Sequence, residues 1–383
     1  MPDFDVIVVG AGPAGSTAAR EIAAAGARVL VVDRASFPRY KACGGGIPVR
    51  AARLLPFPID EVVEDQVSTI DVAWRGRHRF RRDSGRPFAF MAMRDRFDAL
   101  LLREAERAGA GLRLGTRVRH VEHAASGMRV RADGFEASAA VVIAADGAHS
   151  AVGQMLGLGL GMAECAAWEV EVRAPKAQLR RFRGHALIEL GFRPWGYAWL
   201  FPKANLLSIG IVVPREQAHT MKARVDRYIQ SLGLAAAEVE IRRGHKIRFR
   251  RDEPIAGERV LLTGDAAGLA DEFTEEGISY AIHSGRLAAR SALRALGEQG
   301  GLDRYQSDVD AEIMPELRAA RTISHMFYGA LRRAPAAWML ASAHTGLLWD
   351  AFFAVQRGES TYAREVDRIP LLPRISRWMQ ERP

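Results

Sequence analysis

The stretch that decides the fold is "DVIVVGAGPAGSTAAREIAAAGARVLVVDR", from Asp5 to Arg34. It begins with a continuous run of Val and Ile, passes through Gly10, Gly12 and Gly15, and continues as an Ala-rich segment into a second apolar run. A continuous apolar run bounded by turn residues is typical of a buried strand, and the Ala-rich segment favours a helix. The sequence therefore predicts a strand, a tight turn, a helix and a second strand.

The three glycines have the Gly-x-Gly-x-x-Gly spacing of dinucleotide sites. Gly10 permits a tight turn, Gly12 lets the backbone approach a pyrophosphate, and Gly15 lets the helix and the strand pack closely. Backbone N–H groups at the start of the helix then face the anion. Asp33 closes the second strand about 20 residues further along, where a carboxylate can accept hydrogen bonds from ribose hydroxyls. We predict a dinucleotide site here; the alternative is a tight turn in a parallel sheet.

Length and charge set the wider limits. The chain has 383 residues, of which 48% are hydrophobic and 26% charged, so two or three lobes are expected. A net charge of +9 suggests an anionic partner, such as nucleic acid, an acidic membrane surface or a phosphorylated substrate. No Lys/Arg run is interleaved with stacking aromatic residues in the manner of a nucleic-acid module. We therefore predict no nucleic-acid partner and attribute much of the charge to compositional bias toward Arg.

The cysteines and the apolar stretches indicate the compartment. Cys43 and Cys165 are too few for a disulfide framework, and the first apolar run begins at once without a basic leader. The longest apolar stretch, Ala337 to Val355, is interrupted by His344 and Asp350, which favours a buried or interfacial helix over a membrane span. We expect a cytoplasmic protein and leave open a peripheral contact with a membrane.

Two further stretches end apolar strands in polar turns. "VVIAADGAHSAV", from Val141 to Val152, ends its strand at Asp146–Gly147. The segment from Arg259 to Ala289 ends its strand at Gly264–Asp265 and then runs into a helix. The order and spacing of these turns, with an Arg before the amphipathic helix of "MRDRFDALLLREAERAG", resemble the flavoprotein hydroxylase superfamily, in which both turns belong to FAD binding.

The resemblance implies a flavin pose. In that superfamily the Asp of the Gly-Asp turn approaches the ribityl chain, and the next helix start faces the flavin pyrimidine; the matching positions are Asp265 and Gly277–Ile278. A helix N-terminus there would stabilise an anionic reduced flavin. The residues assigned to FAD by motif and resemblance are Gly10, Gly12, Pro13, Ala14, Gly15, Asp33, Arg34, Cys43, Gly44, Gly45, Arg94, Val118, Asp146, Gly147, Gly264, Asp265, Gly277 and Ile278. No second glycine fingerprint is present, so either NAD(P)H or a partner reductase is expected to supply electrons.

Two motifs far apart in the chain narrow the family. "RYKACGGGIP" spans Arg39 to Pro48, and "PWGYAWLFPK" spans Pro194 to Lys203. Together they resemble the geranylgeranyl reductase family of FAD-dependent oxidoreductases, whose members saturate isoprenoid double bonds on lipids, quinols or chlorophyll precursors. The resemblance covers roughly residues 5 to 290.

Alternation along a strand explains the aromatic motif. A strand through 195 to 199 would send Trp195, Tyr197 and Trp199 to one face. Such a face, with Phe201 and Gly46, can line a slot for a polyprenyl chain. The alternative is that the rings only pack the sheet against its neighbours.

Alkene reduction needs a hydride at one carbon and a proton at the other. Cys43 and Tyr197 are the candidate proton donors, because the resemblance brings both motifs over the flavin. Cys43 has an alternative reading as a small buried hydrophobe. We predict no metal site.

One segment departs from the family pattern. Where members usually carry Pro and then Thr-Gly-Glu-Gly-Ile, this chain has Glu272 and Thr274-Glu275-Glu276-Gly277-Ile278. A negative charge at the flavin edge would disfavour an anionic reduced flavin, and the Glu275 side chain would keep the backbone away from the ring.

The predicted fold is α/β: a glutathione-reductase-type FAD-binding Rossmann domain with an inserted, mostly antiparallel β-sheet substrate domain and a helical carboxy-terminal segment. The FAD domain is expected to comprise residues 1–68, 94–163 and 253–300, the substrate domain 69–93 and 164–252, and the helical lid 301–383. The favoured activity is reduction of C=C bonds in an isoprenoid chain on a lipid, quinone or related substrate. A flavin monooxygenase or halogenase acting on a hydrophobic or aromatic substrate, and a flavin- or lipid-binding protein without turnover, are the alternatives.

Overall fold

The structure is a computed structural model that describes residues 1–76, 78–192, 195–297 and 302–368. The chain forms two compact units. The first comprises Met1–Tyr40, Asp95–Ala163 and Ile247–Leu317, and the second comprises Lys41–Arg94, Glu164–Lys246 and Arg318–Pro383. Each unit is therefore assembled from three separate segments of sequence.

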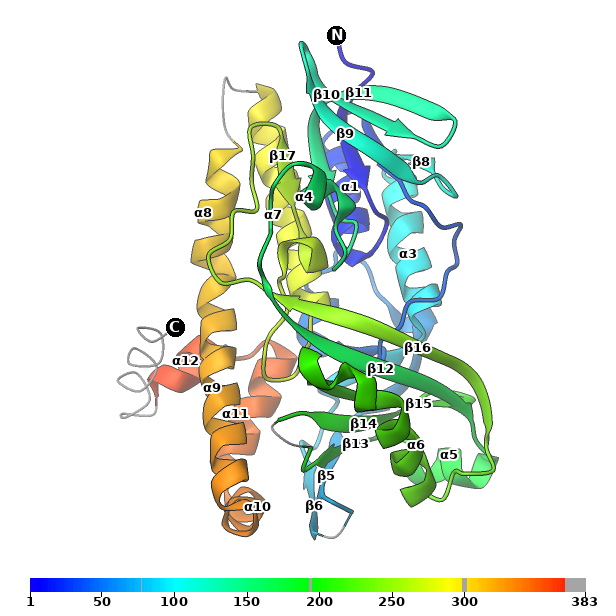
Figure 1. Cartoon of the computed structure of the whole chain (residues 1–383), viewed down its shortest axis with the longest axis vertical. Coiled ribbons are helices and arrows are strands. Elements are labelled where there is room, and N and C mark those ends of the chain that lie inside the picture. The colour runs from blue at the N-terminus through cyan, green and yellow to red at the C-terminus, as the bar shows by residue number, and fades with distance from the viewer. Residues whose placement is uncertain (77, 193–194, 298–301, 369–383) are drawn as a thin grey trace. The chain divides into compact units, whose positions relative to one another are not determined.

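The first unit is built on a seven-stranded sheet (Figure 1). Its strands are β1 (Phe4–Val9), β2 (Val29–Val32), β8 (Gly111–Arg113), β9 (Val118–Ala124), β10 (Gly127–Ala132), β11 (Phe135–Ala144) and β17 (Val260–Leu262). The order is β8-β2-β1-β11-β10-β9, and β17 pairs with the end of β11. Strands β8, β2, β1, β11 and β17 run parallel, whereas β10 pairs antiparallel with both β9 and β11. This is the strand-turn-helix-strand arrangement that the amino-terminal sequence predicts.

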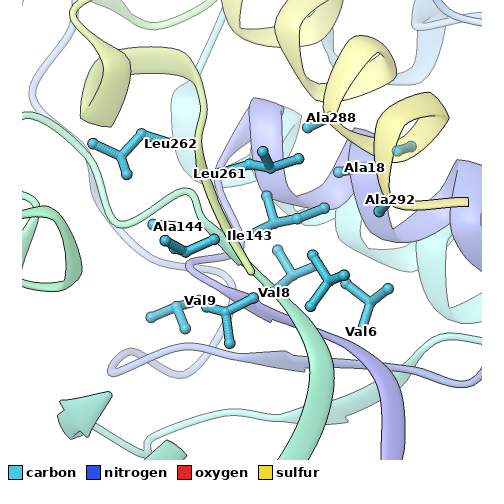
Figure 2. Packing of buried hydrophobic residues seen from close by; sticks show 14 of the residues in the cluster. Val6, Val8, Val9, Ala18, Ile143, Ala144, Leu261, Leu262, Ala288 and Ala292 are labelled. Atoms are coloured by element: carbon cyan, nitrogen blue, oxygen red, sulfur yellow. The ribbon is translucent and has the colours of Figure 1, made fainter. Parts of the chain in front are cut away.

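The continuous apolar runs form parallel strands whose side chains are buried on both faces of the sheet. Figure 2 shows Val8 of β1, Ile143 of β11 and Leu261 of β17 packed beside Ala18 of α1 (Pro13–Ala24) and Ala288 of α7 (Ile278–Gly297). Each fully buried Val, Leu or Ile contributes about 1.5–3 kcal/mol to folding. The parallel strands therefore carry much of the stability of this unit.

Helices α1 and α7 pack closely because both carry small residues at their contact. A Cβ atom on Gly285 of α7 would lie 2.4 Å from the carbonyl oxygen of Ala14, at the start of α1. The remaining helices are α3 (Arg94–Arg107), α4 (Ala151–Met155), α8 (Asp303–Glu312) and the first turn of α9 (Met314–Arg333). Tyr305 anchors α8, because its buried hydroxyl donates to the carbonyl oxygen of Leu262 at 2.7 Å.

The second unit contains a seven-stranded sheet and a three-stranded one. The larger sheet has the order β16-β12-β15-β14-β13-β5-β6. Its strands are β5 (Thr69–Trp74), β6 (His78–Asp83), β12 (Ala163–Arg173), β13 (His185–Leu190), β14 (Tyr197–Pro202), β15 (Leu206–Pro214) and β16 (Glu238–Phe249). The β12-β15, β15-β14, β14-β13 and β5-β6 pairs are antiparallel, and β13 pairs parallel with β5. The smaller antiparallel sheet orders β3 (Gly46–Pro48), β7 (Ala89–Ala92) and β4 (Val63–Val67).

Two hydrophobic clusters lie on opposite faces of the larger sheet. Ala198 and Leu200 of β14 belong to the cluster that includes α6 (Met221–Ser231). Tyr197 and Phe201, which alternate with them, pack against the cluster that includes α10 (Pro335–His344) and α11 (Gly346–Arg357). The short helices α2 (Val49–Arg53), α5 (Lys176–Phe182) and α12 (Tyr362–Asp367) complete the unit. Strand alternation thus separates small and aliphatic side chains from aromatic ones on β14.

The described part of the expected lid consists mainly of the helices α8 to α12, which lie between Asp303 and Asp367. The terminal segment "IPLLPRISRWM", from Ile369 to Met379, lies outside the described residues. Among the described helices, none combines the length and apolar character needed to cross a membrane. Over the same residues, no group of three or more His, Cys, Asp or Glu side chains is placed to hold a metal ion.

Candidate functional site

The glycine turn after β1 depends on close backbone approach. Gly10 has a φ of +103°, and a Cβ atom there would lie 2.3 Å from the carbonyl oxygen of Ala145. A Cβ atom on Gly15 would lie 1.9 Å from the carbonyl oxygen of Gly10. The N-cap residue of α1, Gly12, has no side chain that could bond the first N–H groups of the helix. The turn therefore has the backbone shape and the N–H donors of an anion site.

Asp33 ties the end of β2 to this turn. Its Oδ2 accepts the N–H of Ala11 at 2.7 Å, and its Oδ1 accepts the N–H of Ala35 at 2.8 Å. The sequence also predicts that Asp33 accepts hydrogen bonds from ribose hydroxyls. Each carboxylate oxygen can accept a second hydrogen bond, so the two roles are compatible.

The other predicted turns lie around the start of α1, within the same unit. A Cβ atom on Gly10 would be 3.0 Å from the Cα of Asp146, and one on Gly264 would be 2.9 Å from the Cβ of Ala14. Gly277 lies further along the same loop, and a Cβ atom on it would be 3.4 Å from Oδ1 of Asp265. Motifs that lie more than a hundred residues apart in sequence therefore meet at one edge of the sheet.

Asp146 is a buried carboxyl group with spare hydrogen-bonding capacity. Its Oδ2 accepts the N–H of Val152 at 3.1 Å, whereas its buried Oδ1 has no hydrogen-bond partner among the described residues. Burial raises the pKa of Asp146 above its usual value. A buried, unpaired carboxyl oxygen is costly unless a further group pairs with it. A hydroxyl-rich cofactor supplies such a group, and this observation fits FAD.

Arg39 is a site residue that the sequence interpretation did not assign. Its Nη2 lies 3.0 Å from Oδ2 of Asp98, which is fully buried, and 3.7 Å from the position of a Cβ on Gly12. Within the described part of the chain, its buried Nη1 has no hydrogen-bond partner. A guanidinium with an unused donor beside the pyrophosphate turn fits a phosphate. Arg39 lies two residues before the first residue of the Lys-x-Cys-Gly-Gly-Gly motif, but no spacing rule links it to Gly12.

The loop after β17 neutralises one of its unusual carboxylates. Both carboxylate oxygens of Glu272 are bonded by Arg251, at 2.6 and 3.0 Å. The negative charge that we expected at Glu272 is therefore compensated, because Arg251 forms a bidentate ion pair with it.

Glu275 and Glu276 shape the start of α7. Glu275 has a φ of +54°, in the left-handed region that glycine adopts without strain. Glu276 accepts the N–H of Ser279 through Oε1 at 2.7 Å. The N–H group next to the predicted flavin-facing positions Gly277–Ile278 is thus already bonded to a carboxylate, which weakens the positive end of the helix dipole.

In the second unit, the two motifs of the geranylgeranyl reductase resemblance are in contact. The glycine loop, Cys43–Gly46, lies against the rings of Trp199 and Phe201: a Cβ on Gly44 would be 2.8 Å from Phe201 and 2.9 Å from Nε1 of Trp199. Ring centroids of Tyr197 and Trp199, and of Trp199 and Phe201, are 6.3 Å apart in both pairs. We call Tyr197, Trp199 and Phe201 the aromatic face.

A residue without a side chain makes room for the central ring. Gly210 of β15 pairs with Trp199, and a Cβ atom on it would lie 2.1 Å from that ring. Glu169 of β12 is the partner of Gly210 on its other side. The Trp199 ring therefore lies across β15, where its Nε1 donates to the Oγ of Ser208 at 3.4 Å.

Two buried charges of opposite sign hold the glycine loop. Glu169 accepts the N–H of Cys43 at 2.6 Å and the hydroxyl of Ser208 at 2.8 Å. Lys203, directly after the aromatic strand, donates to the carbonyl oxygens of Gly44 at 2.8 Å and Ala92 at 3.1 Å. Burial lowers the pKa of Lys203 to about 8, against partial compensation from nearby negative groups that include Glu169. These two side chains were also missed from sequence, since their role depends on strand pairing.

Several predicted residues lie apart from these groups. Trp195 precedes β14 instead of lying in it, because Gly196 has a φ of +127° and breaks the extended strand. The Trp195 ring contacts Tyr328, with ring centroids 6.1 Å apart. The three alternating rings on β14 are therefore those of the aromatic face, in which Phe201 takes the place expected for Trp195. Arg34 is exposed. Arg94 is the first residue of α3, and Val118 is the first residue of β9. Gly147 lies in the turn after β11.

Cys43 and Tyr197, the candidate proton donors, both belong to the second unit. The Cys43 side chain is half-buried, and its Sγ accepts the N–H of Gly45 at 3.4 Å. Tyr197 is half-buried beside Trp199. Both therefore border the contact between the glycine loop and the aromatic face.

Residues 3–312 match the protein family described as FAD binding domain. The chain belongs to this family. It is 31% identical over 348 residues to a menaquinone reductase of Mycolicibacterium smegmatis, covering 79% of this chain and 78% of that protein. It is also 31% identical over 349 residues to a digeranylgeranylglycerophospholipid reductase of Methanopyrus kandleri, covering 85% and 90%.

Solved structures support the same fold. A geranylgeranyl bacteriochlorophyll reductase-like protein of Thermoplasma acidophilum superposes with a TM-score of 0.78 at 22% identity, covering 95% of this chain and 98% of that one. A flavin-dependent brominase superposes with a TM-score of 0.75 at 18% identity, covering 99% and 100%. The sequence relatives make this chain an FAD-dependent oxidoreductase of the geranylgeranyl reductase and menaquinone reductase type.

Proposed function

We propose that this protein reduces C=C bonds in the isoprenoid chain of a lipid or quinone. The observation that carries the proposal is the contact between the glycine loop and the aromatic face, because both motifs of the resemblance meet there. The named activities of two relatives, on menaquinone and on a digeranylgeranyl lipid, concern substrates with isoprenoid chains.

The first unit holds FAD, which supplies hydride once it is reduced. The N–H groups at the start of α1 and the guanidinium of Arg39 bind the pyrophosphate. Asp33 and Asp146 accept hydrogen bonds from sugar or ribityl hydroxyls. These roles use the unpaired Oδ1 of Asp146 and Nη1 of Arg39, which burial would otherwise leave unsatisfied.

The second unit binds the apolar chain. The rings of the aromatic face bury hydrocarbon without demanding hydrogen bonds, and they exclude water from the reacting carbons. Cys43 or Tyr197 delivers the proton to the second carbon. Glu169 and Lys203 act as positioning residues, because they hold the glycine loop that carries Cys43.

The deciding experiment is anaerobic. The purified protein, reduced with dithionite, is mixed with a menaquinone or a geranylgeranyl lipid, and the product is examined by mass spectrometry. We expect the gain of two hydrogen atoms per reduced bond within the isoprenoid chain, located by fragmentation, because dithionite also adds two hydrogen atoms to a quinone headgroup. NAD(P)H and a partner reductase are then compared as physiological electron sources.

Three controls make the result specific. Cys43→Ser and Tyr197→Phe are assayed in single turnover; full alkene reduction by either variant removes that residue from the proton role. A product that carries oxygen or halogen, formed only in air, would replace the proposal with a monooxygenase or halogenase. A preparation that stays colourless after FAD addition would contradict every flavin-dependent reading.

A further inference from the structure

The corner between α10 and α11 presents aliphatic side chains to solvent. Leu340, Leu347 and Leu348 are 63%, 76% and 52% exposed. They are three of the eight large hydrophobic side chains that are exposed in the described part of the chain. Single exposed leucines are ordinary, but three within nine residues of sequence form a group.

Packing and hydrogen bonds anchor this corner to the rest of the second unit. Met339, Trp349 and Phe353 direct the other sides of α10 and α11 into a hydrophobic cluster of the second unit. The indole Nε1 of Trp349 donates to the carbonyl oxygen of Ser342 at 2.9 Å. Arg82 of β6 donates to the same carbonyl oxygen at 3.4 Å and also to that of Ala343. The leucines are therefore exposed on an anchored element, not on one that has failed to pack.

The charged side chains that precede the corner in sequence are positive, and the first acidic one after it is Asp350 of α11. No Asp or Glu occurs between Glu316 and Asp350. Arg332 and Arg333, at the end of α9, are exposed directly before α10 begins, and they outnumber the one exposed acid, Asp350, in the first turns of α11. An apolar tip beside cationic side chains suits an anionic lipid surface, where aliphatic groups enter the acyl boundary and cations meet phosphates.

We propose that the α10–α11 corner docks on the surface of an anionic lipid bilayer, with Leu340, Leu347 and Leu348 inserted and Arg332 and Arg333 at the headgroups. A second copy of the chain fits this corner poorly, because a two-fold contact would bring the same cations together. Three leucines alone give weak binding, and cations add the second signal that stable interfacial binding requires. The proposal concerns where the protein works and does not depend on the reaction proposed above.

The test is co-sedimentation of the FAD-loaded full chain with vesicles. Vesicles of phosphatidylcholine are compared with vesicles of phosphatidylcholine and phosphatidylglycerol. The triple variant Leu340→Gln, Leu347→Gln, Leu348→Gln removes the apolar group, and Arg332→Gln with Arg333→Gln removes the cations. Leu160→Gln is the matched control, since Leu160 is 52% exposed but belongs to the first unit.

Wild type and the control should bind the anionic vesicles, and each test variant should bind them about tenfold less or worse. Melting temperature and flavin spectrum show whether a variant is folded. Failure of wild type to sediment, or equal binding by the leucine variant, overturns the proposal. A vesicle-free dimer that the leucine variant abolishes would reassign the corner to self-association. The leucine variant is also assayed with a detergent-dispersed substrate. If it reduces that substrate but no longer binds vesicles, the loss of membrane binding is distinguished from a loss of the proposed activity.

Discussion

The two units build their candidate sites by different physical means. In the first unit, Gly10 and Gly15 let backbone segments approach so closely that the turn itself becomes the binding surface. In the second unit, buried Glu169 and Lys203 hold the glycine loop against the aromatic face through side-chain charges. The shape of the backbone turn is encoded by neighbouring residues. The hydrogen bonds of Glu169 and Lys203 to the glycine loop, in contrast, form only after distant strands have paired. We therefore expect substitutions in the two units to separate cofactor binding from substrate reduction.

The largest effect is expected for Gly15→Val. The first atom of the new side chain would lie 1.9 Å from the carbonyl oxygen of Gly10, so β1 and α1 must separate. We expect a loss of about 4 kcal/mol or more in the free energy of unfolding, together with loss of bound FAD. Urea unfolding and the visible spectrum measure both. Gly297→Ala is the control, since no described residue lies within 4 Å of its Cβ position. A yellow, stable Gly15→Val protein would contradict the close approach.

Lys203 should make stability depend on pH. Its pKa is lowered from 10.5 to about 8 in the folded protein. Between these values the unfolded chain binds the proton and the folded chain has released it, so stability rises with pH across this window. The rise attributed to Lys203 is about 3 kcal/mol, because each pKa unit corresponds to about 1.4 kcal/mol.

The measurement is the free energy of unfolding of wild type and Lys203→Met at pH 8 and pH 10.5. The difference between the two proteins isolates Lys203 from the other groups that titrate. Exposed Lys176→Met is the matched control. Parallel profiles for wild type and Lys203→Met would show that Lys203 is not buried as a cation.

Gly210→Ala should separate the functions of the two units. A Cβ atom at this position would displace the ring of Trp199, which costs about 2 kcal/mol. Alkene reduction should fall sharply while the flavin spectrum is unchanged, because the substitution lies in the second unit. Loss of FAD in a folded Gly210→Ala protein would contradict this separation.

Arg39→Gln should have the opposite signature. Removing a charged hydrogen-bond donor from the pyrophosphate weakens FAD binding by about tenfold or more, since such bonds contribute about 1.5–3 kcal/mol. Isothermal titration of the apoprotein with FAD gives the dissociation constant. With saturating FAD, reduction should recover, and a dissociation constant equal to that of wild type would remove Arg39 from the site.

The smallest effect concerns Glu275→Gly. Relief of the left-handed backbone at Glu275 should stabilise the protein by about 1 kcal/mol. Removing the charge should also raise the flavin midpoint potential, which a redox titration measures. Glu272→Gln serves as the comparison, because Arg251 already pairs with Glu272. An unchanged potential in Glu275→Gly would mean that this carboxylate points away from the flavin.

The prediction of an FAD-binding α/β protein of the geranylgeranyl reductase type is confirmed by the family match and by the relatives. The assignment of individual site residues stays a prediction. Trp195 illustrates the limit of pattern alone: alternation places it with Tyr197, but the backbone at Gly196 turns it toward Tyr328. Alternation predicts a face only where the strand is continuous.

The sequence by itself determined the parallel sheet, the pyrophosphate turn and the flavoprotein family, because glycine spacing and apolar runs act over a few neighbouring residues. Only the tertiary structure decided that Arg39 lies beside Gly12, that Glu169 and Lys203 hold the glycine loop, and that three leucines face outward at the α10–α11 corner. These contacts join residues whose separation in sequence carries no periodic signal. Their partners are chosen by strand register and by the need to pair buried charge.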